Sequence, residues 1–329
     1  MEKQQNKDMK SVFITRKIPD IAFKMLKDRG LNVVLSPKDG ILSKDELISE
    51  LKKQNFDAVL SLLTDKIDRD IFLSSPTTKI FSNYAVGFNN INLDDAKEFG
   101  ITITNTQVTS EEVAEHAVAL ILSLAKRVCE GDRFIRDGKY KGWDPMLLLG
   151  TEIEGKTVGI LGAGRIGRKT AKILKLGFGV NIIYFDIAPN KDFEKELGAV
   201  FFEKYEDVLR QSDIVSVHTP LTKDTVHMID KSKISLMKKT AYLINTSRGP
   251  VIDENALFEA LRDGVIAGAG LDVFEFEPKV TDGLLSLSNV VLTPHIASST
   301  LRAREEMAKI AATNIIDFLE GNEIKNKII

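Results

Sequence analysis

Three glycines, Gly162, Gly164 and Gly167, follow an apolar run at residues 157–161 and open a stretch with helical periodicity. Glycine at the first position permits a sharp turn, and at the second it lets another group approach the backbone closely. At the third it lets the helix pack against the strand. This spacing predicts a strand, a tight turn and a helix in direct succession, which is the opening unit of a parallel α/β sheet.

The same turn is a candidate site for a dinucleotide. The first N–H groups of a helix have no partner within the helix and lie at the positive end of its dipole, so they bind a pyrophosphate. We include Arg165 and Ile166 in this loop, and Asp186 closes the next apolar run. A carboxylate there accepts hydrogen bonds from ribose hydroxyls and repels a 2′-phosphate, so the sequence predicts NAD(H) as cofactor rather than NADP(H). The alternative is a tight turn with a structural role only.

The composition suits a soluble protein with two cores. The chain has 329 residues, of which 43% are hydrophobic, and its net charge of -2 gives no basic field for nucleic acid. The single cysteine, Cys129, lies in an apolar stretch and is predicted to be a buried, inert thiol. No segment has the apolar length of a membrane span, and residues 1–10 lack the apolar region of a signal peptide. We therefore expect a cytoplasmic protein that does not bind membranes.

Short β-branched runs alternate with helical stretches twice along the chain, so we predict an α/β protein with two Rossmann-like parallel-sheet domains. The first domain has expected strands at residues 11–15, 32–35, 57–63, 79–83 and 101–104, and expected helices at 20–28, 44–53 and 93–99. A long helix is expected at 110–135. The second sheet has expected strands at 157–161, 181–185, 199–202, 214–218, 241–245, 266–271 and 290–292.

A final helix is expected at residues 301–320, after the last strand of the second sheet. If it packs back on the first unit, that domain is discontinuous. We place the first, substrate-binding domain at residues 1–106 with 299–329, and the NAD-binding domain at 107–298.

Three chemically active side chains are expected at the carboxyl ends of strands in the second sheet, where doubly wound sheets bind their ligands. Arg248, Glu277 and His295 each follow such a strand. Taken singly, each has an ordinary alternative: a surface salt bridge, a solvated loop residue, or a structural histidine. A cation, an acid and an imidazole at one edge together favour a catalytic site.

Four sequence runs together resemble the D-isomer specific 2-hydroxyacid dehydrogenase family. They are residues 162–167 with the glycines, 245–249 around Arg248, 270–278 through Glu277, and 293–298 around His295. The resemblance covers nearly the whole chain. Residues 15–19, 86–91 and 143–145 most resemble the glyoxylate/hydroxypyruvate reductase branch of the family.

The resemblance implies a role for each matching residue. Arg248 would bind the carboxylate and carbonyl of the substrate, His295 would be the acid/base, and Glu277 would pair with His295. Asp272 would hold the nicotinamide carboxamide. The resemblance also implies further cofactor contacts, made by Thr109, Thr219, Pro220, Thr246 and Ser298. It implies a substrate site formed by Leu63, Trp143 and the backbone amides of Val86 and Gly87.

The implied reaction is the reduction of a small 2-keto acid, such as glyoxylate or hydroxypyruvate, by hydride transfer. Negative charge develops on the carbonyl oxygen during this step, so the site needs a fixed cation and a proton donor. Arg248 and His295 supply them, and the Glu277 carboxylate favours the protonated imidazole. The alternatives are an NAD(H)-sensing binding protein of the corepressor type and a phosphite dehydrogenase.

Other residues carry weaker expectations. His116 lies in the middle of the long helix and is predicted to be a packing or interface residue, and His218 and His227 are interpreted in the same way. Thr109 either contacts the cofactor or caps the helix, and Leu63 is either core or the apolar cover of the substrate site. No clustered ligands suggest a metal. The apolar stretch at residues 138–150, with Trp143, predicts an interface, and the alternative is packing on its own subunit. Its resemblance to the segment that relatives extend across a two-fold axis implies an isologous homodimer, in which Trp143 borders the substrate pocket of the other subunit.

Overall fold

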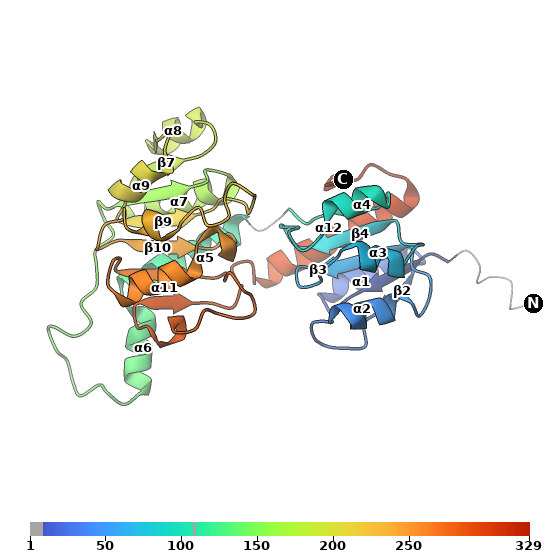
Figure 1. Cartoon of the computed structure of the whole chain (residues 1–329), viewed down its shortest axis with the longest axis horizontal. Coiled ribbons are helices and arrows are strands. Elements are labelled where there is room, and N and C mark those ends of the chain that lie inside the picture. Colours follow the sequence, from blue (N-terminus) through green and yellow to red (C-terminus); the bar gives the residue numbers. More distant parts are fainter. Residues whose placement is uncertain (1–8, 108–109) are drawn as a thin grey trace, which may run out of the picture. The chain divides into compact units, whose positions relative to one another are not determined.

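The computed structural model describes residues 9–107 and 110–329 (Figure 1). The chain divides into two compact units, residues 1–108 with 299–329 and residues 109–298. Each unit is a parallel sheet with helices on both faces, which confirms the predicted fold class.

The first unit has a five-stranded sheet in the order β2-β1-β3-β4-β5, with all neighbours parallel. Its order reverses between β1 and β3, the position at which such sheets bind ligands. The strands are β1 (Ser11–Ile14), β2 (Asn32–Leu35), β3 (Ala58–Leu62), β4 (Ile80–Tyr84) and β5 (Thr102–Thr104). The helices are α1 (Asp20–Asp28), α2 (Lys44–Leu51), α3 (Arg69–Ser74), α4 (Leu93–Glu98) and α12 (Leu301–Glu320).

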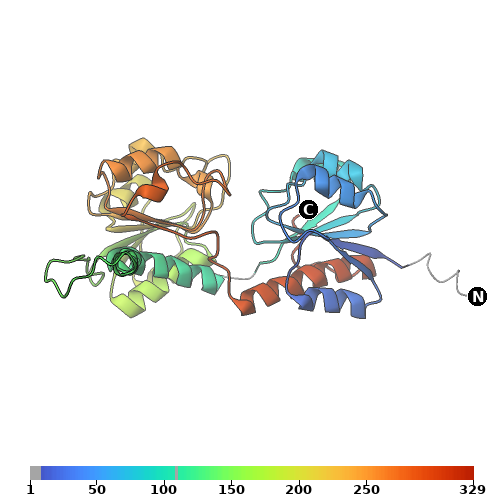
Figure 2. The ribbon, with the colours of Figure 1, turned by 90° about the horizontal axis from the view of Figure 1, so that it is seen from below.

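Alternate side chains of each strand point to opposite faces of this sheet. Val12 and Ile14 pack with α1 and α12 on one face, while Phe13 packs with α2, α3 and α4 on the other. Figure 2 shows α1 and α12 side by side below the sheet. The last helix therefore adds its apolar face, including Met307 and Ile315, to the core built by the first strands.

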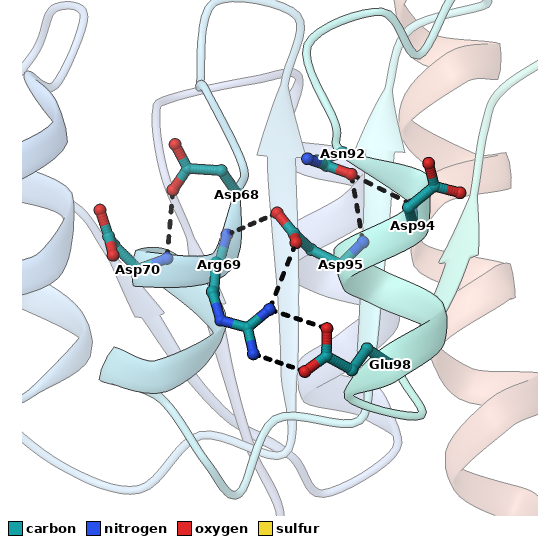
Figure 3. Close-up of polar contacts among 7 residues, drawn as sticks. All are labelled: Asp68, Arg69, Asp70, Asn92, Asp94, Asp95 and Glu98. Atoms are coloured by element: carbon teal, nitrogen blue, oxygen red, sulfur yellow. Dashed lines mark hydrogen bonds and ion pairs between the residues drawn. The ribbon is translucent and has the colours of Figure 1, made fainter.

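The short helix α3, which the sequence analysis did not predict, is tied to α4 by polar contacts (Figure 3). Asp68 caps α3, and Asn92 caps α4 by accepting hydrogen bonds from two backbone N–H groups, each at 3.1 Å. Asp95 accepts a hydrogen bond from the Arg69 N–H at 3.1 Å, and the Arg69 guanidinium forms a two-pronged ion pair with Glu98. These groups are mostly exposed, so each pair stabilises the fold little.

The second unit has a seven-stranded parallel sheet in the order β12-β11-β10-β9-β6-β7-β8. Its order reverses between β6 and β9, as in dinucleotide-binding sheets. The strands are β6 (Thr157–Leu161), β7 (Asn181–Phe185), β8 (Val200–Phe201), β9 (Ile214–Val217), β10 (Tyr242–Asn245), β11 (Gly268–Leu271) and β12 (Val290–Leu292).

One face of this sheet packs against α5 (Ser110–Ala125), α7 (Arg165–Phe178) and α8 (Lys191–Leu197). The other face packs against α9 (Tyr205–Gln211), α10 (Lys231–Ile234) and α11 (Glu254–Arg262). The unit also contains α6 (Val128–Arg136) and two short 3₁₀ helices, η1 (Gly249–Val251) and η2 (Leu284–Ser286).

The prediction of a single long helix at residues 110–135 was wrong, because the chain forms two helices there. Arg127 adopts a left-handed conformation with φ 52° between α5 and α6. The carbonyl of Ala125 accepts a hydrogen bond from the N–H of Thr151 at 2.8 Å, so it is engaged by a returning segment. This contact between distant segments ends α5 where periodicity alone predicts that it continues.

The turn after β10 leaves no space for a side chain at Gly249. A Cβ atom at this position would lie 1.9 Å from the carbonyl carbon and oxygen of Phe274. The loop after β11, which contains Glu277, therefore lies directly on the backbone of the turn after β10.

We predict that Gly249→Ala lowers the free energy of unfolding of the protein by about 1–3 kcal/mol, because the Phe274 backbone must move. Gly177→Ala is the matched control, since a Cβ there meets nothing within 4 Å inside α7. It should raise stability by up to about 1 kcal/mol. Calorimetric unfolding of both variants measures the difference, and equal unfolding temperatures would contradict the close approach.

Candidate active site

The predicted site residues of the second unit lie at one edge of its sheet. In a parallel sheet all carboxyl ends point the same way, so the loops that follow the strands gather there. Gly162 follows β6, Asp186 follows β7 and Thr219 lies just after β9. The loops after β10, β11 and β12 contain Arg248, Asp272 and His295 respectively.

The glycine loop has the geometry that a pyrophosphate requires. Gly162 has φ +94°, and a Cβ atom there would lie 2.9 Å from the backbone of His218 and Thr219. A Cβ at Gly167 would lie 2.1 Å from the Gly162 carbonyl oxygen, whereas Gly164 has nothing within 4 Å. No side chain caps the first turn of α7, which starts at Arg165 and continues through Ile166. This uncapped helix start suits a bound phosphate.

Asp186 is held beside this loop by two backbone N–H groups. Its carboxylate accepts hydrogen bonds from Ala163 and Ile187, each at 2.7 Å, through different oxygens. Each oxygen keeps an acceptor site, because a carboxylate has about four. The position and the remaining acceptor sites suit the ribose hydroxyls of an NAD molecule.

Two buried hydroxyls at the same edge have no hydrogen-bond partner among the described residues. They are the Oγ1 atoms of Thr219 and Thr246, and both residues are less than a tenth exposed. Buried polar atoms are normally paired, so these two fit a bound group that supplies their partners. Pro220 follows Thr219 and is exposed, and Ser298 is half-buried. Thr109 lies outside the described residues.

His295 and Glu277 form a direct pair at 2.9 Å between Nδ1 and Oε2, with about a third of each side chain exposed. An ionised carboxylate only accepts hydrogen bonds, so Nδ1 carries a proton and donates it. Nε2 then faces away from Glu277, and it is a donor in the imidazolium and an acceptor in the neutral ring. This arrangement leaves one ring nitrogen for acid/base chemistry.

Glu277 is kept ionised by its surroundings. Burial alone would raise the pKa of its carboxyl group, but the hydrogen bond from His295 and the nearby positive charge lower it overall. The N–H of Phe274 donates to Oε1 at 2.9 Å, and the charge of Arg248 acts in the same direction. The negative charge of Glu277 is therefore present throughout the neutral range.

Arg248 is positioned by the turn after β10. Its Nη1 donates to the carbonyl oxygen of Ser247 at 2.6 Å, and its own carbonyl accepts from Asn245 at 2.9 Å. Burial lowers the pKa of its guanidinium, and the charge of Glu277 partly offsets this effect. The lowered pKa still leaves a permanent cation, because an arginine is not deprotonated in proteins.

Asp272, at the end of β11, is completely buried and is bound by the loop that carries His295. It accepts hydrogen bonds from the Thr293 hydroxyl at 2.6 Å and from the N–H groups of Ile296 and Ala297, each at 2.8 Å. Burial raises the pKa of its carboxyl group, but these bonds and one from His116 lower it overall. Most of its acceptor sites are therefore occupied by the protein itself.

In the first unit, Val86 and Gly87 follow β4 and have oriented peptide groups. The carbonyl of Ala85 accepts from the Thr106 N–H at 2.9 Å, and that of Val86 accepts from the Asn105 side chain at 2.7 Å. In a planar trans peptide the N–H points opposite to the C=O. The N–H groups of Val86 and Gly87 therefore both point away from Thr106 and Asn105, toward one side, as a pair able to bind an anion.

Two further asparagine side chains, those of Asn83 and Asn90, fix the same loop. The Asn83 amide donates to the carbonyl of Gly87 at 3.0 Å, and Asn90 donates to the carbonyls of Leu62 and Asp65 at 3.1 and 2.9 Å. Sequence reasoning missed these asparagines. The available signal was an amide side chain at or just after each of several strand ends.

The loop after β3 contains Leu63, which is half-buried, and Asp65, which is buried. Asp65 accepts hydrogen bonds from the Thr15 hydroxyl at 2.5 Å and from the Leu62 N–H at 2.7 Å. Burial raises the pKa of its carboxyl group above the usual range. This pair connects the loops after β1 and β3, where the strand order of the first sheet reverses.

The remaining histidines have different surroundings. His218 is half-buried, burial of its ring lowers its pKa to about 4, and its Nε2 lies 2.9 Å from the Ser216 hydroxyl. His227 pairs with Glu275 at 2.6 Å. His116, expected to be a packing or interface residue, is hydrogen-bonded to Thr293.

Two further side chains were singled out by the sequence. Trp143 is 83% exposed within its own chain. Cys129 was expected to be buried but is half-buried, because the helix α6 that carries it has no buried residue.

Metal-binding clusters and membrane spans are both absent from the described residues, 9–107 and 110–329. No three His, Cys, Asp or Glu side chains there are grouped so as to hold a metal ion. No helix in this part of the chain is long and apolar enough to cross a membrane.

Comparisons with known proteins identify the family of this chain. A family model described as the NAD binding domain of D-isomer specific 2-hydroxyacid dehydrogenases matches residues 118–297. The glyoxylate reductase of Thermococcus litoralis is 45% identical over 320 residues, which is 94% of each chain. The glyoxylate reductase of Thermofilum pendens is 47% identical over 313 residues, with 94% of this chain and 91% of that protein covered.

A solved structure, that of the TT0316 protein from Thermus thermophilus, is 38% identical with a TM-score of 0.90 and covers 97% of this chain and 100% of its own. The resemblance predicted from the four motifs is thereby confirmed. The chain belongs to the D-isomer specific 2-hydroxyacid dehydrogenase family and is an NAD-dependent oxidoreductase.

Proposed function

We propose that the protein reduces a small 2-keto acid, glyoxylate or hydroxypyruvate, to the corresponding D-2-hydroxy acid. The observation that carries this proposal is the hydrogen-bonded pair of His295 and Glu277 beside the charge of Arg248. The pair lies at the sheet edge that also carries the glycine loop. The names of the curated relatives, glyoxylate reductases, support the choice of substrate.

Each reacting group has a defined task in this proposal. NADH, when bound, supplies the hydride that reduces the carbonyl carbon. Arg248 binds the substrate and stabilises the negative charge that grows on the carbonyl oxygen. His295 donates a proton from Nε2 to that oxygen, and Glu277 holds the ring through Nδ1 and stabilises its positive charge.

The other predicted residues bind and orient. The oriented N–H groups of Val86 and Gly87 would receive the substrate carboxylate, with Leu63 as an apolar cover. The glycine loop, Asp186 and the two buried threonine hydroxyls would hold the cofactor, together with Thr109, Pro220, Asp272 and Ser298. The first unit is then the substrate-binding domain and the second the NAD-binding domain. We place the protein in the cytoplasm, since NAD(H) is an intracellular metabolite.

A substrate panel tests this function. NADH or NADPH oxidation would be measured with glyoxylate, hydroxypyruvate, pyruvate and longer 2-keto acids. We expect the highest kcat/KM with glyoxylate or hydroxypyruvate and NADH, above about 10⁴ M⁻¹ s⁻¹. NADH formation from phosphite would instead indicate a phosphite dehydrogenase. Tight NADH binding without turnover of any keto acid would favour the corepressor type of protein.

Asp186→Ala is the matched variant for the cofactor part of this panel. Removing the carboxylate takes away both the ribose contacts and the repulsion of a 2′-phosphate. The preference for NADH over NADPH should then narrow by about tenfold or more. A wild-type protein that prefers NADPH would contradict the role given to Asp186.

Glu277→Gln tests the acid/base pair through its pH dependence. Keto-acid reduction needs the imidazolium, so its rate falls as pH rises, while oxidation of the hydroxy acid needs the neutral ring and improves. The neutral amide no longer favours the imidazolium, so the fall of the reduction rate should move to lower pH. At neutral pH we expect reduction to slow by on the order of tenfold. An unchanged pH profile would contradict the pairing.

We also propose that the protein is an isologous homodimer assembled through residues 128–150. Six apolar side chains of this segment are more than half exposed, those of Val128, Ile135, Tyr140, Trp143, Met146 and Leu149. Monomeric proteins rarely leave such a group of large apolar side chains in water. A second copy of the same segment would cover them, and Trp143 of one subunit would border the substrate pocket of the other.

Trp143→Ala tests this assembly. The KM for the keto acid should rise by about tenfold while NADH affinity stays the same, because a buried aromatic anchor is removed from the pocket and not from the cofactor site. Leu73→Ala is the control, since Leu73 is exposed on α3 outside this segment and should leave both values unchanged. Sedimentation that gives a monomer at micromolar concentration would contradict the proposal.

A further inference from the structure

His116 lies on α5 and forms part of a polar network beneath the loop that carries His295. Its Nε2 atom is 2.9 Å from the Thr293 hydroxyl and 3.4 Å from the Asp272 carboxylate. The ring is mostly buried, with 19% of the side chain exposed. A histidine that only fills space in a core does not need two polar partners.

The direction of each hydrogen bond follows from counting protons. The ionised carboxylate of Asp272 has none to give, so the Thr293 hydroxyl donates to it at 2.6 Å. A hydroxyl has a single proton, so the Thr293 oxygen is an acceptor toward His116. His116 must therefore carry a proton on Nε2, in the neutral ring as well as in the imidazolium.

Asp272 connects this hydrogen-bond network to the backbone of the loop that carries His295. Its two carboxylate oxygens accept from the N–H groups of Ile296 and Ala297, the two residues that follow His295. Its carbonyl oxygen accepts from the N–H of His295 itself at 2.9 Å. Three consecutive backbone N–H groups are thus bound to one residue.

This fixation matters because His295 has φ 54°, in the left-handed region that residues other than glycine seldom adopt. Such a conformation persists only where the surroundings impose it. The direction of the imidazole, and hence its distance from Glu277, depends on the backbone that Asp272 holds. Asp272 depends in turn on Thr293 and His116 for its own rotamer.

We propose that His116 and Thr293 are positioning residues, which hold the Asp272 carboxylate and through it the backbone of the acid/base His295. The proposal rests on the proposed function, because it takes His295 as the proton donor. It goes beyond that function by assigning a role to a helix residue that touches neither substrate nor reacting atoms. A structural role alone would affect stability without affecting the protonation of His295.

The first test needs no activity. The chain has four histidines, and two-dimensional nitrogen–proton spectra of the cofactor-free protein distinguish their ring forms. Above the pH at which it loses its second proton, His116 should carry its remaining proton on Nε2 in the wild type. A proton on Nδ1 of His116 in the wild type would overturn the proposal, whatever the substrate panel shows.

The second test compares matched pairs of variants. Thr293→Val removes the hydroxyl at nearly constant volume, and Thr293→Ser keeps it. His116→Leu removes the ring donor, and His116→Gln places an amide N–H near the position of Nε2. We expect the Val and Leu variants to lower kcat by about 10- to 100-fold with little change in the KM of the keto acid, and the Ser and Gln variants to restore most of it.

The pH profile separates positioning from stability. Because a displaced His295 loses its pairing with Glu277, the decline of reduction in Thr293→Val should move to lower pH, as in Glu277→Gln. A Thr293→Val protein with a lower unfolding temperature but the wild-type kcat and pH profile would overturn the proposal. If Thr293→Val does not fold, the His116→Leu and His116→Gln pair decides by the same criteria, together with the spectra of the wild type.

Discussion

The parallel direction of all seven strands in the second unit determines where its chemistry lies. Every loop that follows a strand is brought to one edge, so residues from distant parts of the sequence meet there without special packing. The reversal of strand order between β6 and β9 separates the helices on either side of that point. The loops after these two strands still approach so closely that only glycine fits at Gly162. The same edge continues to β12 and His295, so the cofactor loop and the acid/base pair belong to one rigid sheet.

The polar contacts of the protein differ in their contribution to stability, because their charged groups are buried to different extents. Asp272 is completely buried, and its charge is balanced by hydrogen bonds from the protein, so losing any one of them leaves an unpaired acceptor in a medium of low dielectric. Glu277 and His295 are about a third exposed, which leaves their ring and carboxylate accessible for proton transfer. The ion pair of Arg69 and Glu98 in Figure 3 is more exposed still and is screened by water. The rigidity of the site therefore comes from the buried Asp272 carboxylate, and its reactivity from the partly exposed pair of Glu277 and His295.

The fold could be predicted well wherever periodicity is strong and local. The expected bounds of α1, β6, β7, β12 and α12 agree with the structure, because each is a clear apolar run or an amphipathic stretch between breakers. The expected bounds of β2 also agree, and β4 is shifted by one residue. The other strands are one or two residues shorter than expected, since an apolar side chain near a strand end does not show whether its backbone still pairs. The break between α5 and α6 had no local signal, because it depends on a hydrogen bond from Thr151 to Ala125. The short helix α3, of six residues, was not predicted.

For the site, sequence motifs identify the groups that react, while some of the contacts that aim these groups come from residues outside the motifs, such as His116 and Asn105. Arg248, Glu277 and His295 were predicted because each ends a recognisable run. The partners that orient the loops are separated from them in sequence: His116 and Thr293 are 177 positions apart, and Asn105 reaches back to Val86. An asparagine or a mid-helix histidine has many ordinary roles, so only coordinates reveal that its hydrogen bond fixes a peptide group or a carboxylate. Because a displacement of about 1 Å can slow a reaction a hundredfold, these supporting contacts constrain the chemistry as strongly as the reacting groups do.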